Sequence, residues 1–212
     1  MTKNFNRILI LAPHTDDGEF GCGGSIVKLI EDGKEVYYVA FSTAEDSLPP
    51  GYPSNTLEIE VQKATRTLGI KPPHLLIYKF QVRKLNYIRQ EILEEMVKMK
   101  REIKPDLVFM PSPHDLHQDH YTVAMEGMRA FKQVSIFGYE IPWNNITFHT
   151  QAFITLGKRH IKKKIAALKA YKSQANKSYA TEDFIFSLAR ARGVQIGVEY
   201  AETFEVVRWV IN

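Results

Sequence analysis

The sequence predicts an α/β fold in which helices cover both faces of a mostly parallel sheet, forming a three-layer sandwich. Two observations carry this prediction. Short apolar runs of strand length alternate with segments of helical spacing, which is typical of parallel strands joined by right-handed helical crossovers. The first run, 8–12, is apolar at every position, as expected for a strand buried on both faces. A chain of 212 residues is long enough to form one domain, 1–212, with its own core.

Strands and helices can be assigned in order along the first two thirds of the chain. The expected strands are 8–12, 35–42, 75–80, 107–110 and 134–141. The expected helices between them are 25–31, 55–68, 85–103 and 119–131. The helix at 85–103 has the most regular pattern, because its apolar residues recur every three or four positions and share one face: Leu85, Ile88, Ile92, Met96, Met99 and Ile103.

The last quarter of the chain departs from this alternation. The expected elements there are a short strand at 153–156, helices at 159–172 and 181–192, and a terminal strand at 204–211. Earlier, a proline-rich loop spans 43–54. A loop of this length in a compact domain is often functional, for example as a lid over a site.

Composition and charge exclude several classes of protein. The chain is 44% hydrophobic, with 28 basic and 24 acidic side chains, which is globular rather than fibrous or disordered. The polar start, 1–6, shows no signal peptide, and no run approaches the ~18 apolar residues of a membrane span. The single cysteine, Cys22, excludes an internal disulfide. We therefore expect a cytoplasmic protein without membrane insertion, and leave homo-oligomerisation open.

The densest group of positive charges runs from Lys158 to Lys164. The simplest interpretation is a solvated helix face. The alternative is a patch for nucleic acid or for a phosphorylated substrate. Because no nucleic-acid-binding motif accompanies the run, no nucleic-acid partner is expected.

Residues that carry chemistry gather directly after two of the predicted strands. The first group is His14, Asp16, Asp17 and Glu19, and the second is His114, Asp115, His117, Asp119 and His120. Open α/β sheets bind ligands at the carboxyl ends of their strands. If the strand order reverses between the first and fourth strands, both groups line one crevice.

Imidazole and carboxylate groups that converge on one point indicate a divalent metal, with zinc as the first choice and ferrous iron as an alternative. His14, Asp17 and His120 could supply two nitrogens and one oxygen and leave a position for water. Asp16 would then be free to act as a base. The glycines among residues 18–24 would let a tight backbone wrap the crowded site.

Three of these features also have other interpretations. Asp119 lies just before a predicted helix and could be its N-cap. A dinucleotide site is disfavoured, because the glycines after the first strand do not have the G-x-G-x-x-G spacing. Cys22 could be a soft ligand, but it is better explained as a small packed residue.

At this point the chain resembles the PIG-L/LmbE-like family of zinc-dependent N-deacetylases. His14-Thr15-Asp16-Asp17 resembles the family's His-Pro-Asp-Asp signature, and His117-Gln118-Asp119-His120 resembles its His-x-Asp-His signature. Supporting similarities lie at Gly21–Gly24, at Glu60 with Ala64 and Leu68-Gly69, and in 169–174 and 189–204. The resemblance therefore covers nearly the whole chain.

This resemblance implies an LmbE-like, Rossmann-like fold and a hydrolase of linear amide bonds. Its partner would be a small molecule, an N-acetylated amino sugar such as an N-acetylglucosamine conjugate, from which zinc-activated water removes the acetyl group. The implied metal ligands are His14, Asp17 and His120. Asp16 would be the general base, and His117, oriented by Asp119, would stabilise the oxyanion.

The sequence departs from the family pattern at two positions. Thr15 replaces the usual proline, and Leu57 stands where many members have an arginine that helps to hold substrate. The substrate is therefore expected to differ from theirs. Candidate pocket walls are the loop 43–54, with Tyr52, and the segment 143–149, with Trp143 and Phe148. Another metallohydrolase, such as a phosphoesterase acting on an anionic sugar, is kept as the alternative function.

Overall fold

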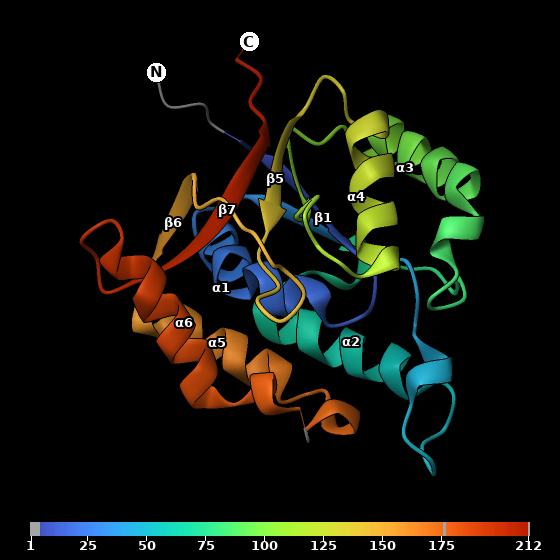
Figure 1. Ribbon diagram of the computed structural model, residues 1–212, viewed down its shortest axis with the longest axis horizontal. Coiled ribbons are helices and arrows are strands. Elements are labelled where there is room, and N and C mark those ends of the chain that lie inside the picture. Colours follow the sequence, from blue (N-terminus) through green and yellow to red (C-terminus); the bar gives the residue numbers. More distant parts are fainter. Residues whose placement is uncertain (1–4, 176, 212) are drawn as a thin grey trace.

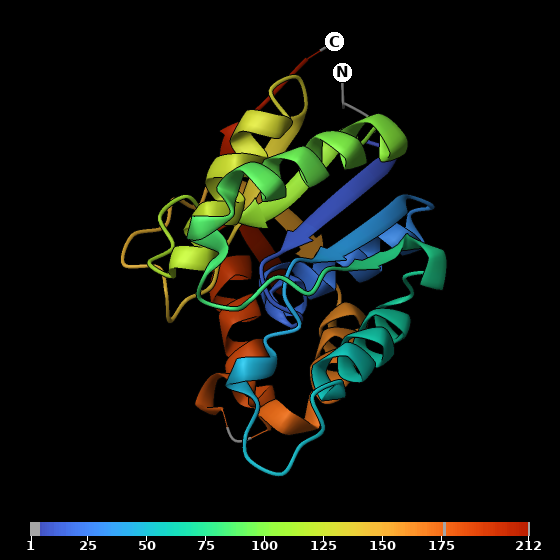
Figure 2. The same ribbon diagram turned by 90° about the vertical axis from the view of Figure 1, so that its right-hand side faces the viewer.

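A seven-stranded sheet lies between two layers of helices in the computed structural model, which describes residues 5–175 and 177–211 (Figures 1 and 2). The strands are β1 (Arg7–Ala12), β2 (Glu35–Ala40), β3 (Leu75–Ile77), β4 (Leu107–Pro111), β5 (Ser135–Tyr139), β6 (Ala152–Leu156) and β7 (Tyr200–Arg208). The helices are α1 (Asp17–Glu31), α2 (Thr56–Leu68), α3 (Arg89–Ile103), α4 (Gln118–Ala130), α5 (Lys158–Leu168) and α6 (Glu182–Val194). The predicted three-layer α/β sandwich is confirmed.

The alternating side chains of β1 explain why this strand is apolar throughout. Ile8 and Ile10 pack in the core formed with α1, α2, α5 and α6, whereas Leu9 and Leu11 pack in the core formed with α3 and α4. Figure 2 shows α3 and α4 on one side of the sheet and α2 and α5 on the other. The regular apolar face predicted at 85–103 lies in the second core, with its first residues in a short 3-10 turn, Leu85–Tyr87, before α3.

The strand order places the two predicted groups of chemistry-bearing residues together. The order is β3-β2-β1-β4-β5-β7-β6. The first five strands in this order are parallel, and β7 is antiparallel to both of its neighbours, β5 and β6. From β1 the chain builds outward through β2 and β3, and then returns to place β4 against the other edge of β1. The strand order therefore reverses between the first and fourth strands, the condition under which both groups line one crevice, and the loops that follow β1 and β4 are neighbours.

The helix expected at 25–31 begins eight residues earlier, at Asp17. The glycine-rich stretch that the prediction left outside the helix is therefore helical, with one non-helical residue, Cys22 (φ −146°). The glycines permit a close approach of α1 to the sheet. A Cβ atom at Gly18 would lie 2.5 Å from the ring of Tyr38, and one at Gly21 would lie 2.3 Å from the ring of Tyr139. Cys22 is buried and its thiol donates to Gly18 O (3.3 Å), as expected of a packed residue.

Element ends differ from the predictions mainly near the C-terminus. The last strand, β7, starts at Tyr200 rather than at 204, and β3 ends at Ile77 rather than at 80. The loop 43–54 contains a 3-10 turn, Glu45–Ser47. Most of the polar N-terminal stretch, residues 1–4, lies outside the described residues. Within 5–175 and 177–211, none of the helices has the length and apolar character of a transmembrane span.

The basic run lies on α5 and is only partly a solvated face. Lys162 and Lys163 are exposed, but Lys164 is buried. The ammonium of Lys164 donates to Glu202 Oε1 (2.7 Å) and to Phe20 O (2.6 Å), which ties α5 to β7 and to α1. This lysine is therefore a structural cation and not part of a surface patch.

We expect Gly21→Ala to destabilise the chain by about 1–3 kcal/mol, the usual range for overpacking, because the added methyl overlaps the ring of Tyr139. Gly157→Ala is the matched control. Its Cβ meets nothing closer than 3.9 Å, so only the N-cap of α5 changes, at about 1 kcal/mol or less. Urea unfolding followed by circular dichroism measures both. Equal stability of the two variants would contradict the proposed close packing of α1.

Candidate metal centre and active site

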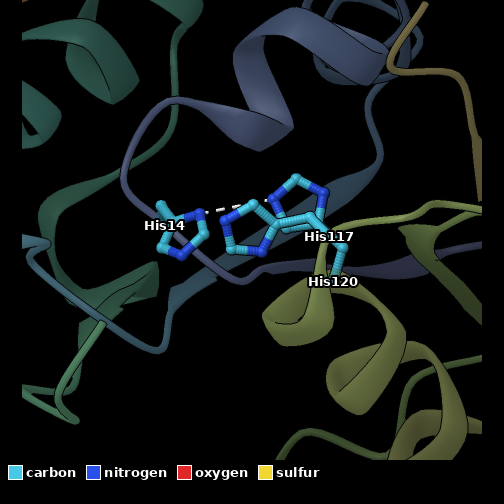
Figure 3. Close-up of side chains that lie close together, drawn as sticks. All are labelled: His14, His117 and His120. Atoms are coloured by element: carbon cyan, nitrogen blue, oxygen red, sulfur yellow. Dashed lines mark hydrogen bonds between the residues drawn. The ribbon is translucent and has the colours of Figure 1, made fainter. Parts of the chain in front are cut away.

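Three side chains predicted as metal ligands meet where β1 and β4 end. His14 lies in the turn after β1, Asp17 is the first residue of α1, and His120 lies in the first turn of α4. His14 Nδ1 is 3.1 Å and His120 Nε2 is 3.2 Å from the same oxygen, Asp17 Oδ2. The two ring nitrogens are 3.3 Å apart, and a dashed line marks this contact in Figure 3.

The spacing of these three atoms fits a divalent metal. A tetrahedral zinc ion with bonds of about 2.0–2.1 Å holds its ligand atoms roughly 3.3 Å apart. The observed separations of 3.1, 3.2 and 3.3 Å are close to that value. The side chains therefore have the chemistry and the separations of a zinc site, and ferrous iron suits the same nitrogen and oxygen donors.

Each histidine of the triangle also has a carboxylate on its other ring nitrogen. His120 Nδ1 is 2.7 Å from Asp115 Oδ2, and His14 Nε2 is 2.9 Å from Asp119 Oδ2. Such outer carboxylates fix the tautomer and the direction of a metal-binding histidine. In the sequence, Asp115 lies among the grouped histidines but has no predicted role. The usual presence of a carboxylate behind a histidine ligand was the signal that could have found it.

The structure places Asp119 differently from its interpretation as an N-cap. The N-cap of α4 is His117, whose Nδ1 accepts the backbone N–H of Asp119 (3.1 Å). The carboxylate of Asp119 turns the other way, toward His14, and accepts the backbone N–H groups of Arg83 (2.6 Å) and Leu85 (3.2 Å). Asp119 thus contacts His117 through its main chain, and its carboxylate holds His14.

Charge in the triangle favours a bound cation. Burial alone would lower the pKa of His14 and His120, but the charge of Asp17, with hydrogen bonds to carboxylates, raises these pKa values to about 9 and about 10. Burial opposes ionisation of Asp17, yet the two histidines hold the pKa of this carboxyl far below its usual range. The site therefore binds positive charge, which either protons or a metal can supply.

Asp16 and His117 lie beside the triangle and have different electrostatics. Burial and the neighbouring charge of Asp17 raise the pKa of Asp16 to about 6. Burial and the charges of His120 and His14 lower the pKa of His117 to about 4. The ring of His117 stacks on His120 with centroids 4.6 Å apart. Because Nδ1 of neutral His117 accepts a backbone N–H, its proton resides on Nε2, where it is a hydrogen-bond donor.

Comparison with known proteins agrees with this geometry. Residues 9–131, more than half of the chain, match the PIG-L family model, described as GlcNAc-PI de-N-acetylase. The chain belongs to the PIG-L family.

This PIG-L chain is similar to two proteins named as deacetylases and to one solved structure with the same fold. It is 31% identical over 136 residues to a diacetylchitobiose deacetylase of Thermococcus kodakarensis, in a match covering 60% of this chain and only half of that relative. It is 26% identical to the probable N-acetyl-α-D-glucosaminyl L-malate deacetylase 2 of Bacillus anthracis, covering 94% of this chain and 93% of the relative. The structure of the conserved protein TT1542 from Thermus thermophilus superposes with a TM-score of 0.82 at 25% identity, covering 97% and 96% of the two chains.

Buried hydrogen bonds hold the turn of the first PIG-L signature in place. The hydroxyls of Tyr38 and Tyr171 lie 3.0 and 2.6 Å from Thr15 O, and both also contact the carboxyl of Glu19. Burial raises the pKa of Glu19 to about 8, which favours the neutral carboxyl, a group that can donate as well as accept. Tyr171 lies in the segment 169–174, which thus contacts the turn that carries His14.

The triangle opens into a pocket whose walls come from several parts of the chain. The lining residues are His14, Thr15, Asp16, Asp17, Phe20, Ala44, Ser47, Leu57, Val82, Arg83, His117, His120, Trp143, Asn144, Gln174, Lys177 and Tyr179. Both predicted walls contribute, but Tyr52 and Phe148, although described, are not among these residues. Trp143 is, and its ring stacks on Tyr179 with centroids 3.7 Å apart.

Positive charge reaches the pocket from positions that the sequence analysis missed. Arg83 and Lys177 line it, whereas none of the residues 158–164 does. The basic run therefore gives no support for an anionic substrate in this pocket. Leu57, at the position where many family members have an arginine, also faces the pocket. Arg83 follows a loop far from Leu57 in sequence, so no local pattern could have indicated it.

We expect His120→Ala, treated with chelator and reconstituted with zinc, to bind one equivalent of metal fewer than the wild-type chain, with unchanged secondary structure. Asp115→Asn keeps the three ligands but loses the carboxylate that orients His120, so its zinc affinity should fall about 10- to 100-fold. Metal analysis and circular dichroism on the same preparations check both. Wild-type metal content in His120→Ala would remove this residue from the ligand set.

Proposed function

We propose that residues 1–212 act as one metal-dependent deacetylase domain that removes acetyl from an N-acetylated amino sugar or its conjugate. The observation that carries the proposal is the triangle of His14, Asp17 and His120 beside two further groups, Asp16 and His117, in one pocket. The named relatives that act on acetylated sugars support the same substrate class. Derivatives of N-acetylglucosamine are the first candidates.

Amide hydrolysis needs a nucleophile, stabilisation of an oxyanion and a proton for the leaving nitrogen. A divalent metal held by the triangle would supply Lewis acidity and lower the pKa of water to about 7. Asp16 is assigned as general base, because it lines the pocket, lies outside the triangle and is largely ionised at neutral pH. It would take a proton from the attacking water and return it to the amine.

His117 is assigned as the oxyanion donor. Its Nδ1 accepts the N–H of Asp119, so the Nε2–H is free for the pocket, and the lowered pKa keeps the ring neutral at pH 7. A neutral donor stabilises the charge that develops on the acetyl oxygen without losing its own proton. Asp115 and Asp119 are positioning residues that hold His120 and His14.

The sugar itself would lie against the wall that carries Trp143. Trp143 is 39% exposed, and Tyr179 covers one face of its ring, which leaves an aromatic surface for a sugar. Asn144 and Gln174 add hydrogen-bonding groups to the same pocket. Arg83 and Lys177 would bind an anionic part of a conjugate. The same two basic side chains favour the second candidate function, a phosphoesterase acting on an anionic sugar.

One assay separates the two candidates. The zinc-reconstituted chain is incubated with N-acetylglucosamine conjugates, nucleotide sugars and free chito-oligosaccharides, and acetate, free amine and phosphate are measured together. We expect acetate and amine in equal amounts from at least one substrate. Phosphate release without acetate would replace the deacetylase by the phosphoesterase.

We expect Asp16→Asn to keep its metal and to lower kcat by about 10²- to 10⁴-fold, because asparagine cannot accept and return a proton. His117→Ala should also keep the metal and lose about 10²- to 10³-fold. Asp32→Asn, an exposed aspartate paired with Lys28, is the matched control and should retain full activity. If Asp16→Asn loses its metal while Asp17→Asn keeps it, the roles of the two aspartates are exchanged.

We expect Trp143→Ala to raise KM about 2- to 10-fold with a smaller change in kcat, because an aromatic contact contributes about 0.5–1.5 kcal/mol beyond its buried area. Trp209→Ala is the control, because Trp209 is also partly exposed but contacts Phe5 and Phe137 outside the pocket. Steady-state kinetics on the substrate found in the assay measure both. Unchanged constants for Trp143→Ala would exclude stacking on the sugar.

A further inference from the structure

A second group of metal-ligating side chains lies outside the pocket. His114, His149 and Glu205 each offer one ligand atom, and these atoms lie within 4.8 Å of one another. His114 comes from the loop between β4 and α4, His149 from the segment between β5 and β6, and Glu205 from β7. Three segments distant in sequence thus present two imidazoles and one carboxylate to one point.

One pair in this group, His114 and Glu205, has the spacing seen in the first triangle, and the ligand atom of His149 lies within 4.8 Å of both. His114 Nδ1 lies 3.1 and 3.3 Å from the two carboxylate oxygens of Glu205. Two ligand atoms of one tetrahedral zinc ion are roughly 3.3 Å apart. The rings of His114 and His149 meet edge to face, with centroids 5.5 Å apart. The side chain of His114 is 49% exposed and that of Glu205 only 5%. The carboxylate of the group is therefore buried, and the imidazole of His114 is open to solvent.

The charge of Glu205 is the reason to expect a cation here. Two other buried carboxylates pair with a lysine or an arginine, Glu202 with Lys164 and Glu140 with Arg192. Glu19 and Glu60 are held by hydroxyl groups instead. In the ion pairs between described residues, Glu205 has only a histidine as partner, His114. A buried carboxylate without a positive partner is costly. Asp17 in the first triangle has the same kind of environment.

Other contacts hold Glu205 in place. The hydroxyl of Ser112 donates to Oε2 at 2.5 Å, and the backbone N–H of His149 donates to Oε1 at 2.9 Å. Carboxylates that bind a metal are usually held in place by hydrogen bonds of this kind. Two histidines and a glutamate are also a ligand set that zinc uses while it keeps one position open.

We propose that His114, His149 and Glu205 bind a second divalent metal ion, zinc, separately from the ion expected at the first triangle. This ion neutralises Glu205 and joins three segments of the chain. One of them carries part of the pocket wall. The segment between β5 and β6 meets the loop before α4 through a bridge of Asp115 with Asn145, and the N–H of Leu116 donates to Asn144 O (3.2 Å). The ion therefore stabilises the wall that holds Trp143 and Asn144.

Zinc stoichiometry tests the proposal on the full chain without an affinity tag. After chelator treatment and equilibrium dialysis against zinc, the wild-type chain should bind two equivalents. His114→Ala and His149→Ala should each bind one. His74→Ala is the matched control, because His74 also contacts a glutamate, Glu35 at 3.6 Å, and should leave two equivalents. A wild-type chain that binds fewer than two equivalents, or two equivalents retained in the His114→Ala/His149→Ala double variant, overturns the proposal.

Thermal melting gives an independent readout of the second site alone. In His14→Ala/His120→Ala, which lacks two ligands of the first triangle, added zinc should still raise Tm, because an ion bound only by the folded chain stabilises it. Adding His149→Ala should abolish that rise. An unchanged zinc-dependent rise in the triple variant, or none in the double variant, overturns the second site. Both chains are already without the first site, so the outcome does not depend on the proposed deacetylase activity.

Discussion

The carboxylate of Asp17 is the group on which the arrangement of the site depends. One of its oxygens, Oδ2, accepts the backbone N–H of His14 (2.8 Å) and contacts the rings of His14 and His120. Asp17 begins α1, where the partial positive charge of a helix N-terminus also favours a carboxylate. A buried negative charge in this place requires two imidazoles around it, and they come from the ends of two adjacent strands. The reversal of strand order at β1 and β4 is what makes that possible.

The packing of α1 connects this charge to the core. The helix reaches the strand ends because its first turns approach the sheet more closely than a side chain would allow. Gly18 lies against Tyr38, and Gly21 against Tyr139. Tyr38 then uses its hydroxyl for Thr15 O and Glu19, so the residue that packs on α1 also fixes the turn that carries His14. Close packing of the helix and orientation of the ligands thus have one structural origin.

The sequence predicted what local patterns encode. Strand positions followed from apolar runs, the helix at 85–103 from its regular spacing, and the meeting of His14, Asp17 and His120 from parallel strands that end together. The start of α1 was missed, because glycines lower helix propensity and their packing partners lie far away in sequence. The carboxylate contacts of Asp115 and Asp119 were missed for a similar reason. A sequence position does not show which way a side chain turns.

Two neighbouring residues of the loop between β4 and α4 contact different parts of the molecule. Its Asp115 faces inward to His120, while its neighbour His114 faces Glu205 on β7. The triangle is held by buried groups, whereas the pocket walls come from the loop 43–54, the segment after β5 and the region around Lys177. The side chains of Leu57, Arg83 and Lys177 line these walls and are not among the ligands of the triangle. With Leu57 in place of the usual arginine, and with Arg83 and Lys177 in the pocket, the proposed enzyme is expected to bind a different conjugate at the same metal ligands.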